Sequence, residues 1–176
     1  MELKEIERKA EQILKDNDIS SLPIDVLDLS IKMGVRVEAI DFENDDVSGI
    51  FILKNDKPYI GYNKDQGKNR VRFTIAHELG HYILHSENQQ LFIDKSKKVM
   101  YRDANSSTGE LLLEREANSF AASRLMPEFM IEKELINTPQ NNSDKDTIEQ
   151  LAEKFSVSTQ ALSFRLSNLG YDFGLF

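Results

Sequence analysis

Residues 72–81 read Arg-Phe-Thr-Ile-Ala-His-Glu-Leu-Gly-His, and their spacing predicts a helix on which two histidines share a face. A helix turns by about 100° per residue, so His77 and His81 project together, with Cα atoms roughly 6 Å apart. Apolar residues on the neighbouring arc are expected to anchor the helix in a core: Phe73, Ala76, Leu79, Gly80, Ile83 and Leu84. Two imidazoles held in this way can bind one metal ion.

Glu78 lies about 100° round the helix from His77, so it cannot bind the same ion from the same face. It can still reach a water molecule that the ion activates. In the H-E-x-x-H pattern two neutral imidazoles bind zinc and the carboxylate takes a proton from that water. The chain has no cysteine, so any zinc is held by His, Asp or Glu. The pattern predicts zinc ligands at His77 and His81 and a catalytic base at Glu78.

A catalytic zinc site needs a third protein ligand, and the next predicted helix offers Glu110, Glu114 and Glu116. Asn118 follows Glu114 by one turn, so both can lie on one face, with the amide touching a ligand imidazole. Phe120, one turn after Glu116, is apolar. Glu114 is therefore the preferred ligand, and a solvated helix face is the alternative for each glutamate.

His85 completes the set of three histidines in the chain. On a straight helix it lies about 12 Å along the axis from His77, too far for all three to bind one tetrahedral ion. We expect His85 at the surface, with a contact to a ligand or to substrate as the alternative.

The rest of the chain mixes helical and strand patterns, which predicts an α+β fold. Helical patterns cover residues 2–17, 23–34, 70–85, 110–125 and 127–136. Strand patterns cover residues 35–37, 49–53 and 58–62, and we expect a small antiparallel sheet with one hairpin. The polar stretch 86–109 is expected to form a loop or flap, with strand-like islands at 91–93 and 99–101.

Three parts are expected along the chain: a domain at 1–136 that includes the N-terminal helices, a linker at 137–147, and a small helical segment at 148–176. The linker has turn composition, with Thr138, Pro139, Asn141, Asn142 and Ser143. The last segment has the apolar spacing of a helix-turn-helix, with the turn at 156–158. Residues 144–172 carry three basic and five acidic groups. We therefore expect a helical cap or a protein-binding surface there, and direct DNA binding is the disfavoured alternative.

The whole chain has 30 acidic residues against 22 Lys and Arg, a net charge of −8, which disfavours nucleic acid and anionic membranes as partners. No apolar run approaches the roughly 20 residues that span a bilayer, and the amino terminus does not have the pattern of a signal peptide. We expect a cytoplasmic protein that does not bind membranes.

Taken together, these motifs resemble the ImmA/IrrE metallopeptidases, a gluzincin-like family found in bacteria, mobile elements and phages. Residues 72–81 are similar to the active-site helix of that family. Residues 114–121, Glu-Arg-Glu-Ala-Asn-Ser-Phe-Ala, followed by Leu-Met-Pro at 125–127, are similar to its second signature. The early helices, Ser48-Gly49 and residues 151–158 are also similar, so the resemblance covers most of the chain.

The resemblance implies a zincin-like fold in which His77, His81 and Glu114 hold zinc and Glu78 is the general base. Glu114 stands first in the family's E-x-x-A-N pattern, where the first glutamate is the ligand. The implied activity is that of a zinc endopeptidase that cleaves a helix-turn-helix repressor and so relieves repression in a phage, a mobile element or a stress response.

Two alternatives to cleavage are a regulator that binds its repressor without cutting it and a DNA-binding regulator that uses the C-terminal segment. An intact Glu78 favours chemistry, because a binding role alone needs no base at that position. The donor that would stabilise the oxyanion stays open among five residues: Tyr62, Arg70, His85, Tyr101 and Arg102. The strand at residues 59–62 is a candidate to pair with an extended substrate.

Overall fold

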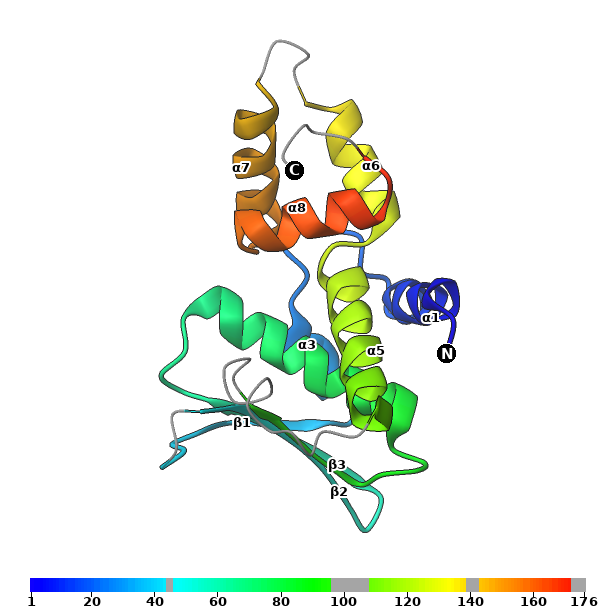
Figure 1. The fold of residues 1–176 in the computed structure, drawn as a ribbon, viewed down its shortest axis with the longest axis vertical. Helices are drawn as coiled ribbons and strands as arrows, with labels where there is room; N and C mark the ends of the chain where they lie inside the picture. The colour runs from blue at the N-terminus through cyan, green and yellow to red at the C-terminus, as the bar shows by residue number, and fades with distance from the viewer. Residues whose placement is uncertain (44–45, 96–107, 139–142, 172–176) are drawn as a thin grey trace.

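Four short strands form one sheet, with helix α3 lying across one of its faces (Figure 1). The computed structural model of the chain describes residues 1–43, 46–95, 108–138 and 143–171. The strands are β1 (Arg36–Ile40), β2 (Val47–Lys54), β3 (Lys57–Asn63) and β4 (Leu91–Lys95), in the order β1-β3-β2-β4. Asn55 and Asp56 have positive φ angles of 50° and 58°, which suit the two-residue turn of the β2–β3 hairpin.

The sheet is mixed, whereas a wholly antiparallel sheet was expected from the sequence. β1 pairs with β3 in parallel, from Arg36 opposite Tyr59 to Ile40 opposite Asn63. A hairpin turn fixes the direction of β2 against β3, but β1 and β3 are not joined by a turn. Their relative direction is set by tertiary packing, which the strand pattern does not record.

Residues 91–95, expected within a loop or flap, form strand β4 and pair antiparallel with β2. The island at 99–101 lies outside the described residues. β3 has β1 on one side and β2 on the other, so both of its edges are paired. The expectation that residues 59–62 pair with a substrate strand is therefore wrong, because no backbone edge is free there.

The helices lie on the side of the sheet that α3 covers: α2 and α5 pack against α3, and α6, α7 and α8 form a group farther from the sheet (Figure 1). They are α1 (Leu3–Asp16), α2 (Val26–Lys32), α3 (Lys68–His85), α5 (Thr108–Leu125), α6 (Glu128–Ile136), α7 (Asp144–Phe155) and α8 (Thr159–Asn168). Two buried clusters meet at α3: Ile75 and Ala76 join the C-terminal helices, and Leu79 joins α1 and the sheet. Burial on both sides fixes the rotation of α3 about its axis.

α3 and α5 approach each other closely at Gly80. A Cβ atom at this position would lie 3.2 Å from the Cα of Ala117 and 3.2 Å from a ring carbon of Phe120. This close approach brings the α5 glutamates within reach of the α3 histidines.

The C-terminal helices share a buried cluster with α3 and α5. Arg72 of α3 donates to the carbonyl oxygens of Ile24, Phe155 and Ser156, at 2.8, 3.3 and 3.2 Å. α7 begins at Asp144, inside the expected linker, with Ser143 as its N-cap. The division into parts at 1–136, 137–147 and 148–176 stays a prediction. Among the described residues, no helix is long and apolar enough to cross a membrane.

Candidate metal centre

Three side chains from two helices point their donor atoms at one another. The Nε2 atoms of His77 and His81 on α3 are 3.1 Å apart. Glu114 on α5 places Oε2 3.2 Å from His77 Nε2 and Oε1 3.3 Å from His81 Nε2. His77 and His81 are buried, and Glu114 is partly buried. The structure therefore brings together the three residues that the sequence nominated as zinc ligands.

This donor set fits a zinc ion. Zinc binds imidazole nitrogen and carboxylate oxygen at about 2.0–2.2 Å, so two ligand atoms of a tetrahedral site lie about 3.3–3.6 Å apart. The observed separations of 3.1–3.3 Å are close to that range. Burial lowers the pKa of His81 from 6.5 to about 4, so its imidazole is neutral, as a metal ligand must be.

Asn118 contacts His77 at Nδ1, the ring nitrogen that faces away from Glu114. Its Oδ1 lies 3.1 Å from His77 Nδ1 and accepts a hydrogen bond from the ring when Nδ1 carries the proton. That tautomer leaves the lone pair on Nε2, which faces Glu114. Asn118 and Glu114 share a face of α5, one turn apart, as the sequence suggested.

His85 is buried, which corrects the expectation of a surface position. Its side chain is 4% exposed, with Nδ1 3.1 Å from His81 Nδ1 and Nε2 3.0 Å from Glu116 Oε2. It lies beyond the donor set, as the helix geometry required. Burial alone would raise the pKa of Glu116, but hydrogen bonds from the Met1 ammonium and His85 bring it below its usual value. The sequence did not show this pairing because it depends on the packing of α3 against α5.

Glu78 is fully buried, and among the described residues neither of its carboxylate oxygens has a hydrogen-bond partner. Burial raises the pKa of Glu78 well above its usual value, and the charges of Asp94 and Glu114 raise it further. Gly49 on β2 makes room for this side chain, since a Cβ there would lie 2.9 Å from Glu78 Oε1. A buried carboxylate without a partner is costly. It is consistent with a group whose partner is a water molecule or substrate at a metal.

Asp94 on β4 is a neighbour that the sequence analysis missed. With His77 and Glu78 it forms a second group of donor atoms that lie within 4.8 Å of one another. Arg70 donates to Asp94 Oδ2 at 3.3 Å and to Ser48 Oγ at 2.9 Å. The signal was the alternation in β4, where Leu91 and Ile93 are exposed while Phe92 and Asp94 are buried. Because β4 is short, this alternation was concealed within the polar stretch 86–109.

Comparisons with known proteins identify the family of the chain. The family model Peptidase_M78, the IrrE N-terminal-like domain, matches residues 32–167. The chain belongs to this family. This match confirms the sequence resemblance to ImmA/IrrE proteins. The family is one of metallopeptidases.

The chain is also similar to one curated protein and to one solved structure. Metallopeptidase ImmA of Bacillus subtilis (strain 168) is 28% identical over 142 residues, covering 73% of this chain and 76% of the relative. A solved structure of a Mycobacterium tuberculosis transcriptional regulator matches with a TM-score of 0.64 at 18% identity. That match covers 93% of this chain and 46% of the regulator, so the chain spans about half its length. The likeness supports the α+β fold.

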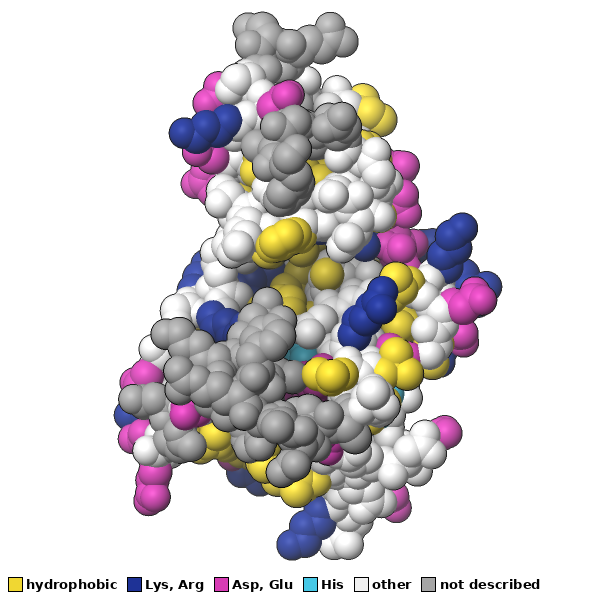
Figure 2. Space-filling view, in the orientation of Figure 1, with side chains coloured by type: hydrophobic (Ala, Val, Ile, Leu, Met, Phe, Trp, Pro, Cys, Tyr) yellow, Lys and Arg dark blue, Asp and Glu magenta, His cyan; other side chains and the backbone are white. Residues whose placement is uncertain are grey.

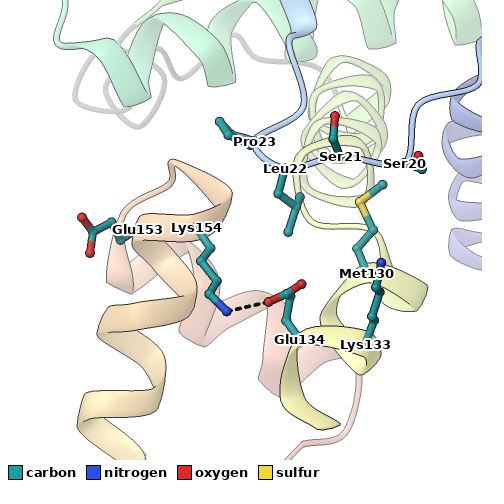
Figure 3. Close-up of a pocket in the computed structure, with 9 residues that line it drawn as sticks. All are labelled: Ser20, Ser21, Leu22, Pro23, Met130, Lys133, Glu134, Glu153 and Lys154. Carbon is teal, nitrogen blue, oxygen red and sulfur yellow. Dashed lines mark hydrogen bonds and ion pairs between the residues drawn. The ribbon is translucent and has the colours of Figure 1, made fainter. Parts of the chain in front are cut away.

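One cavity of this IrrE N-terminal-like domain, of about 490 Å³, lies away from the metal centre (Figure 3). Residues of the α1–α2 connection, α6 and α7 line it: Ser20, Ser21, Leu22, Pro23, Met130, Lys133, Glu134, Glu153 and Lys154. An ion pair of 2.6 Å joins Lys154 to Glu134 across it. None of the residues nominated for catalysis or metal binding lines this cavity.

The five candidates for the oxyanion donor have different surroundings. His85 has both ring nitrogens within hydrogen-bond distance of protein groups, and Tyr62 packs against the cluster of the C-terminal helices. Tyr101 and Arg102 lie outside the described residues. Arg70, partly exposed and next to Asp94, is the described candidate with a cationic group on the Glu78 side of the centre.

Proposed function

We propose that the chain is a zinc-dependent endopeptidase in which His77, His81 and Glu114 hold the metal. The observation that carries this proposal is the convergence of three side chains, with nitrogen and oxygen atoms 3.1–3.3 Å apart, beside a buried carboxylate that has no hydrogen-bond partner among the described residues. A structural site with four protein ligands would leave no position for water, whereas three ligands leave one open. The family match supports metallopeptidase chemistry at this place.

A zinc ion at this site would polarise the scissile carbonyl group and increase the acidity of a water molecule. Glu78 accepts a proton from the attacking water and delivers it to the leaving amine. Burial, and then the charges of Asp94 and Glu114, raise the pKa of Glu78, and a higher pKa makes its carboxylate a stronger proton acceptor for the attacking water. Arg70 is proposed to stabilise negative charge on the carbonyl oxygen.

An extended substrate is proposed to add to the edge of strand β4. Within the described ranges β4 pairs with β2 alone, and the substrate strand is proposed to form main-chain hydrogen bonds with its other backbone edge. A carboxylate oxygen of Asp94 on β4 lies within 4.8 Å of one of Glu78, so β4 runs beside the site. A peptide paired along β4 would pass the metal centre in an extended conformation, which favours cleavage in a loop or an unfolded segment.

The proposed substrate is a helix-turn-helix repressor, so that cleavage relieves repression in a phage, a mobile element or a stress response. Support comes from the ImmA/IrrE resemblance and from a structural relative that is itself named a transcriptional regulator. A partner of this kind acts on DNA in the cytoplasm, where we also place this chain.

Direct DNA binding by the C-terminal helices has less support. The three basic groups of residues 143–171 are all paired with acidic ones: Lys145 with Glu149, Lys154 with Glu134, and Arg165 with Glu7. On the face that Figure 2 shows, the basic side chains of the described residues are scattered among acidic ones. A surface of this kind lacks the basic stripe that phosphate binding requires.

The test is co-expression with a helix-turn-helix repressor from the same genome. Wild type is compared with Glu78→Gln and with Glu87→Gln, which alters an exposed glutamate just after α3. We expect repressor fragments with wild type and Glu87→Gln, and intact repressor with Glu78→Gln. Relief of repression by all three proteins without fragments would contradict cleavage and support a non-cleaving regulator.

A further inference from the structure

A buried pair next to the metal centre, His85 and Glu116, has no role in the proposed chemistry. The two side chains are 4% and 6% exposed. His85 follows His81 by one turn of α3, and Glu116 comes from α5. Burying an imidazole and a carboxylate is costly unless each is hydrogen bonded, and an apolar pair would fill the same space without that cost. The pair therefore invites an explanation beyond packing.

If His81 binds a metal, the hydrogen bonds of this pair can run in a single direction. Its Nε2 lone pair then faces His77 and Glu114, so the ring proton is on Nδ1. The nearest acceptor for that proton is His85 Nδ1, at 3.1 Å. His85 must then carry its own proton on Nε2, which lies 3.0 Å from Glu116 Oε2. An ionised carboxylate accepts hydrogen bonds and donates none.

We propose that Glu116 and His85 are positioning residues that hold His81 in the tautomer and ring orientation in which Nε2 faces the metal. The inference rests on the proposed metal site. Glu116 acts through His85, and His85 acts on His81 directly. The arrangement matches the role of Asn118 behind His77, so each imidazole ligand has its own support, one from α5 directly and one through a second histidine.

Packing reinforces the same orientation of His81. The ring of Phe92 on β4 stacks on His81, with centroids 4.0 Å apart and planes inclined by 20°. Phe92 confines the ring plane, but a stacked ring cannot distinguish this orientation of His81 from one turned by 180° in the same plane. The hydrogen bond to His85 supplies that distinction, because a ring turned by 180° would present a C–H group to His85 Nδ1.

The first test measures zinc affinity by competition with a chromogenic chelator. His85→Leu removes the acceptor, and we expect zinc binding about 10- to 100-fold weaker. His85→Gln keeps an acceptor and a donor in one side chain, and we expect an affinity within about threefold of wild type. All variants carry the same amino terminus, because the Met1 ammonium contacts Glu116 Oε1.

The order of these two variants decides between positioning and packing. Leucine suits a buried apolar place better than glutamine, so a packing role predicts that His85→Leu binds zinc as tightly as His85→Gln, or more tightly. That result would overturn the proposal. Glu116→Leu should also weaken binding, while the double variant with His85→Leu should bind no more weakly than His85→Leu alone, since Glu116 acts through His85. If the two substitutions instead reduced zinc affinity independently, so that their fold-losses multiplied in the double variant, Glu116 would not act through His85.

A second measurement needs no variant. The chain has three histidines, so the ring nitrogens of the zinc-loaded protein can be assigned by long-range ¹H–¹⁵N correlation. We expect a proton on His81 Nδ1 and on His85 Nε2, with His85 Nδ1 unprotonated. A proton on His85 Nδ1 would overturn the proposal. Failure of wild type to bind zinc would instead refute the proposed function, and absence of cleavage by the zinc-loaded protein leaves both measurements valid.

Discussion

At the scale of single residues, Glu78 combines a functional position with an unfavourable environment. It is buried without a hydrogen-bond partner, and burial raises its pKa well above 4.5. In the unfolded chain the same carboxyl group ionises near its usual pKa. Between the two values the folded state keeps a proton that the unfolded state has lost, so the folded state loses stability as the pH rises. A base poised for catalysis therefore lowers the stability of the metal-free protein.

We predict that Glu78→Gln stabilises the metal-free protein more at pH 8 than at pH 5. Glutamine does not ionise, so the pH-dependent cost disappears, and the difference in the free energy of unfolding should grow by about 1 kcal/mol or more. Urea unfolding of chelator-treated wild type and variant measures it. Glu87→Gln is the matched control and should show no such trend. Equal gains for Glu78→Gln at both pH values would show that the carboxyl group does not titrate as proposed.

The sequence foresaw some site residues and not others for a geometric reason. His77, Glu78 and His81 fall within about one helical turn, so their relative positions follow from helix geometry alone. Glu114 needed a chemical argument, the missing ligand, together with the position of Asn118. The places of His85 and Asp94 depend on which elements pack against α3; the alternation in β4 indicates that Asp94 is buried, but not that it lies beside Glu78.

At the scale of elements, the packing of β2 against α3 sets the position of Glu78. A Cβ atom on Gly49 would lie 2.4 Å from Thr74 Cγ2 and 2.9 Å from Glu78 Oε1. Contacts this short would force the strand and the helix apart. The helices were foreseen because their apolar periodicity is long, whereas β4 and the direction of β1 depend on pairing partners that are distant in sequence.

Gly49→Ala is predicted to lower the free energy of unfolding by about 1–3 kcal/mol, because the added methyl group overpacks the β2–α3 interface. It should also slow peptide cleavage while zinc content stays unchanged, since Glu78 is displaced but the ligands are not. Gly67→Ala is the control, because no atom lies within 4 Å of its added Cβ. It sits at the N-cap of α3, where we expect a change under about 1 kcal/mol. A neutral Gly49→Ala would show that the interface is loosely packed.

At the scale of the whole molecule, the C-terminal helices are tied to the helix that carries the metal centre. Arg72 binds the carbonyl oxygens of Phe155 and Ser156 at the end of α7, and that of Ile24 before α2. Arg165 of α8 donates to the carbonyl oxygen of Met126 at 3.0 Å and contacts Glu7 of α1. These ties join segments far apart in the sequence, which composition and periodicity could not reveal.

Arg72→Met should destabilise the protein by about 2–3 kcal/mol, because three carbonyl groups lose a charged donor while the apolar stem is kept. Guanidinium-induced unfolding measures the change. Arg36→Met is the control, since Arg36 is exposed and its ion pair with Glu38 lies at the surface, so its loss should leave the stability nearly unchanged. Equal effects of the two substitutions would contradict a central role for Arg72.

The central claim is that α3 and α5 together hold one metal ion through His77, His81 and Glu114. The most direct measurement is the zinc bound per chain, at saturating zinc and after removal of free metal, for Glu114→Ala and Glu116→Ala. We predict that Glu114→Ala loses the zinc and that Glu116→Ala retains close to one ion per chain, since Glu116 supports a ligand without being one. Loss of zinc in Glu116→Ala with full retention in Glu114→Ala would contradict this assignment of the metal centre.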